Sequence, residues 1–86
     1  MSAMQAAALL ESLEEPISRR AGPIGRLILR KKSRELGLRT GMVDEEKARN
    51  LMFELGSVFF VVLGEETGVA TLARIRETMV EMGLDV

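Results

Sequence analysis

Apolar positions in the centre of the chain recur at the spacing of an α-helix. Seven of them fall three or four residues apart on one helical face: Ala48, Leu51, Met52, Leu55, Val58, Phe59 and Val62. Three carboxylates at 44–46 precede this run, where negative charge favours a helix N-terminus. Gly64 follows it, where a helix-ending glycine is expected. The pattern predicts a central helix of about 20 residues, roughly 30 Å long.

The end of this run is open to a second interpretation. Residues 57–63 are rich in aromatic and β-branched side chains and lie between two glycines. A short apolar run bounded by glycines is also typical of a buried strand. The alternative fold class is therefore α+β, with a short buried strand at 57–63. We favour the helix, because residues 26–30 are the only other strand-like stretch and two strands form a marginal sheet.

Two amphipathic helices are predicted before the central one. The first covers residues 2–15 and is expected to end at Pro16, because the residue before a proline avoids the helical conformation. The second covers residues 23–36 and begins at Pro23, because a proline in the first turn lacks only an N–H group that the helix does not use. The side of this helix that faces the core is assigned to Ile24, Leu27 and Ile28.

A fourth helix is predicted at residues 66–82. The linker at 64–68 is short, so the last two helices should be antiparallel neighbours. We therefore predict that residues 1–86 form a single all-α domain. Its architecture should be a compact four-helix bundle, completed by self-association.

The expectation of self-association comes from apolar residues on a second side of the central helix. Phe53 and Phe60 are seven positions apart and share a side that differs from that of Leu55. A helix that is apolar on all sides must be buried on more than one of them, and a chain of 86 residues can cover only part of its own apolar surface. We predict that a second copy or a protein partner covers the remainder, with the interface formed by Phe53, Phe60, Val61 and Met52.

A membrane span is not expected. The apolar run covers about 13 residues and includes Glu54, whereas a spanning helix needs about 20 apolar residues. The first residues lack the basic stretch of a secretory signal. The absence of cysteine is compatible with the reducing cytoplasm, where we expect the protein to reside.

The composition argues against catalysis. The chain has no cysteine and no histidine, which excludes thiol chemistry, imidazole acid–base catalysis and the commonest zinc sites. Its carboxylate pairs fall at predicted helix starts or on polar faces, where they remain solvated, and the glycine-rich phosphate-binding motifs are absent. We expect a non-enzymatic protein with no catalytic residue, no cofactor and no metal.

Charge is segregated along the chain, although the net charge is only −1. Residues 19–40 carry eight basic side chains against one carboxylate, between two acidic flanks. Such a segment can follow phosphates. The alternative function is therefore a nucleic-acid-binding regulator that uses the basic segment 19–39 through Arg26, Arg30, Lys31, Lys32 and Arg34. Opposite charge blocks also favour contacts between protein surfaces, and we place self-association first.

Overall fold

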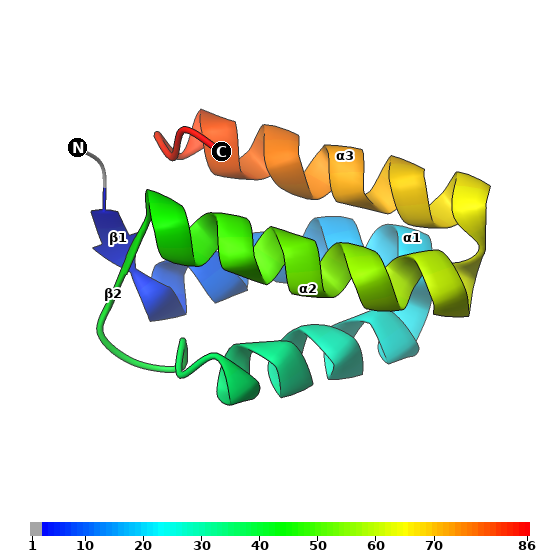
Figure 1. Ribbon diagram of the computed structural model, residues 1–86, viewed down its shortest axis with the longest axis horizontal. Coiled ribbons are helices and arrows are strands. Elements are labelled where there is room, and N and C mark those ends of the chain that lie inside the picture. Colours follow the sequence, from blue (N-terminus) through cyan, green and yellow to red (C-terminus); the bar gives the residue numbers. More distant parts are fainter. Residues whose placement is uncertain (1–2) are drawn as a thin grey trace.

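The computed structural model describes residues 3–86, and these are mostly helical (Figure 1). Two three-residue strands pair antiparallel, with Met4 opposite Val43. The elements follow one another in the order β1 (Ala3–Gln5), α1 (Ala6–Glu35), β2 (Met42–Asp44), α2 (Glu45–Leu63) and α3 (Glu65–Glu81). The helical class predicted from the sequence is therefore confirmed, whereas the two strands were not predicted.

The central helix is confirmed, and the alternative strand at 57–63 is wrong. These residues form the last two turns of α2, because the helical spacing brings Leu55 and Phe59 to the same fully buried side. Asp44 caps the helix, since its side chain accepts a hydrogen bond from the backbone N–H of Lys47 at 2.9 Å. Gly64 ends it with a φ of 85°, a conformation that side-chain-bearing residues seldom adopt.

The start of the predicted first helix needs correction. Residues 3–5 form β1 instead, and residue 2 lies outside the described residues. The cause is long-range, because the backbone N–H of Ala6 donates to the carbonyl oxygen of Gly41 at 2.9 Å. That bond and the strand pairing hold residues 3–6 beside residues 41–44.

Pro16 does not end this helix. α1 runs through it, because Leu13 and Ile17 on either side are fully buried, and their burial offsets the roughly 3 kcal/mol that an interior proline costs. The helical dihedrals break at Gly22 (φ 65°, ψ −157°), and α1 folds back there into two arms (Figure 1). The described residues therefore form three helices, the first of them bent, in place of the predicted four-helix bundle.

The predicted inward side of the second arm holds only in part, because Ile28 packs partly buried against the core whereas Ile24 is 49% exposed. Leu27 is 63% exposed, whereas Gly25, Leu29 and Ser33 are buried. The reason is the close approach of the two arms at Gly25, where a Cβ atom would lie 2.5 Å from the Cβ of Ala21. Only glycine permits this distance, and the contact turns the Gly25 side of the arm inward.

α2 and α3 are antiparallel neighbours, as predicted, and a single residue connects them (Figure 1). Their backbones approach closely at Gly68, where a Cβ atom would lie 2.8 Å from the carbonyl oxygen of Phe59. At Gly56 a Cβ atom would lie 3.0 Å from Cδ2 of Leu72. Gly56 and Leu72 therefore mark the line along which α2 faces α3.

We predict that Gly25→Ala destabilises the fold. The new methyl group would overlap Ala21, and overpacking of this kind costs about 1–3 kcal/mol, more than the gain in helix propensity returns. Urea denaturation should show a lower midpoint for Gly25→Ala. Lys31→Ala in the same arm, which changes an exposed side chain, should stay within about 0.5 kcal/mol of the wild type. An unchanged midpoint for Gly25→Ala would show that the arms are not in close contact.

Candidate functional site

Two phenyl rings of α2 lie on the surface. Phe53 is 74% exposed and Phe60 is 51% exposed, whereas the neighbouring Phe59 is fully buried. The core is closed by side chains on the other side of the helix, among them Leu51 and Leu55. The fold thus leaves two of its three phenyl rings at least half exposed to water.

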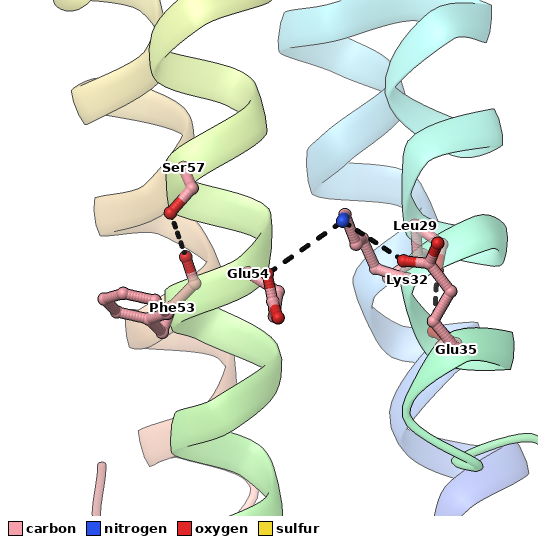
Figure 2. A network of polar contacts seen from close by, with 7 residues as sticks. Leu29, Lys32, Glu35, Phe53, Glu54 and Ser57 are labelled. Atoms are coloured by element: carbon pink, nitrogen blue, oxygen red, sulfur yellow. Dashed lines mark hydrogen bonds and ion pairs between the residues drawn. The ribbon is translucent and has the colours of Figure 1, made fainter.

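The contacts of α2 show which way these rings face. Gly56 faces Leu72 of α3, and Phe53 and Phe60 lie three residues before and four residues after it, on the same side of the helix. Glu54 points the other way, towards Lys32 of α1, at 3.9 Å from its Nζ atom. Figure 2 shows Phe53 and Glu54 projecting to opposite sides of α2. The exposed rings therefore flank the boundary with α3.

A surface cavity marks this boundary. It has a volume of about 340 Å³ and is bounded by α2, α3 and the residues after α3. Its lining consists of Arg49, Met52, Phe53, Leu72, Arg76 and Val86. Of these residues, Met52 and Leu72 are half-buried and apolar, whereas Arg49 and Arg76 are exposed.

Exposed valines of α3 extend the apolar surface. Val69 and Val80 are about half exposed. Val69 lies three residues before Leu72 and Val80 lies four residues after Arg76, and both Leu72 and Arg76 line the cavity. The two valines therefore lie on the same side of α3 as the cavity. We call this surface the α2–α3 face. It comprises Phe53, Phe60, Val69 and Val80, with Met52 and Leu72 between the helices.

The structure separates the four residues predicted as the interface. Phe53, Phe60 and Met52 belong to the α2–α3 face, whereas Val61 lies seven residues after Glu54 and therefore on the side of α2 that faces α1. Val61 is 80% exposed. The sequence interpretation missed the contribution of α3, because it assigned the interface to residues of the central helix alone. The eleven-residue spacing of the two exposed valines of α3, close to three helical turns, was the available signal.

The basic residues do not form one continuous surface. Arg26 and Arg30 both reach the same carboxylate oxygen of Glu14 on the first arm, at 3.5 and 3.4 Å. Lys32 is held between Glu35 at 3.1 Å and Glu54 at 3.9 Å (Figure 2). The two remaining members of the predicted set are Lys31 and Arg34. Both are exposed, and neither makes an ion pair within residues 3–86.

Other kinds of site find little support in the described part of the chain. No group of three or more acidic side chains there is placed to hold a metal ion. None of its helices combines the length and apolarity needed to cross a bilayer. Comparison with models of known protein families, with curated proteins and with solved structures finds no match. The α2–α3 face is therefore the most distinctive feature for a functional argument.

We expect stability measurements to separate the core of α2 from this face. Leu55→Ala should lower the free energy of unfolding by about 2–5 kcal/mol, because it leaves a cavity at a fully buried position. Phe53→Ala should change it by less than about 1 kcal/mol, since the ring is mostly in water already. Both values should be measured by denaturation at protein concentrations low enough to keep the chain monomeric. Equal losses for the two variants would show that Phe53 is part of the core.

Proposed function

We propose that this protein is a small non-catalytic helical module that self-associates through the α2–α3 face. The observation that carries the proposal is the exposure of Phe53 and Phe60 on one side of a helix whose opposite side already completes the core. Contiguous exposed apolar surface on a small protein commonly marks an interaction site. The paired rings, rather than any single residue, make this face unusual.

Burial of the exposed phenyl rings would favour an assembly in which the α2–α3 face is covered. Full burial of one phenyl ring stabilises by about 1.5–3 kcal/mol relative to leaving it exposed. Aromatic side chains are also the residues that most often act as anchors of protein interfaces. Two rings and two valines on adjoining helices therefore offer a substantial free energy of association that the isolated chain does not use.

Nucleic-acid binding remains the second proposal, and the ion pairs weigh against it. Arg26 and Arg30 share one carboxylate, that of Glu14, and Lys32 lies between two carboxylates. A phosphate backbone would have to compete with these contacts. The observation that keeps the proposal open is a small cavity of about 160 Å³ whose lining includes three guanidinium groups, those of Arg30, Arg34 and Arg39.

The self-association proposal predicts that Phe60→Glu abolishes assembly. A carboxylate at this position would be desolvated against an apolar partner surface, at a cost that removes the gain from burial. Sedimentation equilibrium should show a concentration-dependent dimer for the wild type and a monomer for the variant, with unchanged helical content by circular dichroism.

Leu27→Glu supplies the matched control. Leu27 is an exposed apolar side chain on α1, away from the α2–α3 face, and its replacement adds the same charge. This variant should assemble like the wild type. A wild type that stays monomeric at every accessible concentration would refute the proposal, as would equal assembly of Phe60→Glu and the wild type.

Gel retardation with duplex DNA and RNA distinguishes the two proposals. If the α2–α3 face is the functional surface, neither duplex should be retarded, even at low salt. Retardation that disappears steeply with added salt and is lost in Lys31→Glu/Arg34→Glu would instead support nucleic-acid binding. Phe60→Glu serves as the control variant here, because it leaves the basic segment intact.

A further inference from the structure

Three arginines meet at a small cavity near the C-terminal end of α1. The cavity has a volume of about 160 Å³. Its lining consists of Leu10 from the first arm of α1, Arg30, Ser33 and Arg34 from the second arm, and Arg39 from the loop after the helix. We call this cavity the arginine notch. Its lining carries three positive charges and no carboxylate.

The local backbone brings the three guanidinium groups to one place. The two arginines of the second arm are one helical turn apart and share a side of the helix. Gly37 then reverses the chain with a φ of 69°, and the N–H of Leu38 donates to the carbonyl oxygen of Ser33 at 2.8 Å. Leu38 is buried, so the backbone that carries Arg39 is held against the last turn of the helix.

The acidic side chains of the first arm lie at a neighbouring cavity. Glu11 and Glu14 line that space, which has a volume of about 270 Å³ and lies between the two arms. From there, one oxygen of Glu14 reaches Arg30 at 3.4 Å and Arg26 at 3.5 Å. A single carboxylate is thus shared between two arginines, and it lines the neighbouring cavity rather than the arginine notch.

The other two arginines of the notch have no acidic partner. Neither Arg34 nor Arg39 makes an ion pair within residues 3–86. Glu35, which follows Arg34 in the sequence, pairs with Lys32 at 3.1 Å. The helix dipole favours a cation in the last turn, but this does not account for Arg39, which lies beyond the helix. Guanidinium groups around one small cavity repel one another, and an anion between them would relieve that repulsion.

We infer that the arginine notch binds a phosphate-type oxyanion, either inorganic phosphate or the phosphate group of a small ester. Guanidinium groups donate charge-assisted and often paired hydrogen bonds to phosphate oxygens, and their convergence favours an anion with more than one negative charge. The notch is a local site rather than part of a continuous basic surface, because Arg26 and Lys32 on the same arm are engaged by carboxylates. The inference is independent of self-association, since α2 and α3 contribute no residue to the lining.

Ser33 lines the notch without supplying a donor. Its side chain is buried, and its hydroxyl already donates to the carbonyl oxygen of Leu29 at 2.7 Å. Recognition of the anion therefore depends on the guanidinium groups, above all on those of Arg34 and Arg39. This difference between the lining residues supplies a matched control.

Titration with inorganic phosphate tests the inference. Isothermal titration calorimetry of the full chain, in a buffer without phosphate and at constant ionic strength, should show one phosphate bound per chain. Arg34→Gln and Arg39→Gln should each weaken binding at least about tenfold, the loss expected for one charge-assisted hydrogen bond. Phosphate should also raise the melting temperature of the wild type, because it binds the folded state, and the rise should be smaller in both variants.

Two variants serve as controls. Arg20→Gln removes an exposed arginine of the first arm, next to the bend at Gly22 and outside the notch, and Ser33→Ala removes only a hydroxyl. Both should bind phosphate like the wild type. Absence of phosphate binding by the wild type would overturn the inference. Equal weakening by Arg20→Gln and Arg39→Gln would overturn it as well, since it would reflect a general attraction of anions to the basic segment.

Two further probes identify the source of the phosphate group. Glycerol phosphate that binds more tightly than inorganic phosphate would assign the notch to small phosphate esters, and weaker binding would assign it to the free ion. Duplex DNA that binds while both small probes fail, and whose binding is weakened equally by Arg39→Gln and Lys31→Gln, would overturn the inference in favour of an extended nucleic-acid surface. Phe60→Glu should keep phosphate binding, so this inference and the proposed function can fail separately.

Discussion

The burial of one side of α2 is the constraint on which the other features of this molecule depend. Leu51, Leu55 and Phe59 are fully buried between α1 and α3, and their helical spacing fixes the direction of every other residue on that helix. Phe53 and Phe60 then point outward, because no further element of the described chain reaches that side. The two rings are therefore exposed because the opposite side of α2 is the one that packs into the core. Both sides of α2 can be buried at once only if another molecule covers the outer one.

The ion pairs show how the charge segregation of the sequence is used in the fold. Glu14 on the first arm of α1 holds Arg26 and Arg30 of the second, and Lys32 links that arm to Glu54 of α2. Such exposed pairs contribute little to stability, typically 0–1 kcal/mol each. Their larger effect is to engage three of the five basic residues predicted to contact nucleic acid.

Much of the local structure follows from short-range chemistry. The apolar spacing, the acidic start and the Gly64 end of α2 could all be predicted, as could the antiparallel α2–α3 pair and the helical start at Pro23. The strands were not, because three residues are too few to show an alternating pattern and their pairing joins positions about 40 residues apart. Helix continuation through Pro16 was also hidden, since it depends on tertiary burial around the proline.

The residues of the candidate site also divide into those that the sequence predicts and those that only the packing of the helices decides. Periodicity alone placed Phe53 and Phe60 away from the core side of α2, since the angle between residues of one helix is a property of the helix itself. It could not say that Met52 would join them while Val61 would not, or that Val69 and Val80 would extend their surface. It also assigned Leu27 to the core, where the structure has Gly25. These outcomes depend on how each helix is rotated against its neighbours. That rotation is decided by close contacts such as Gly25 against Ala21 and Gly68 against Phe59, which form only when distant segments pack together.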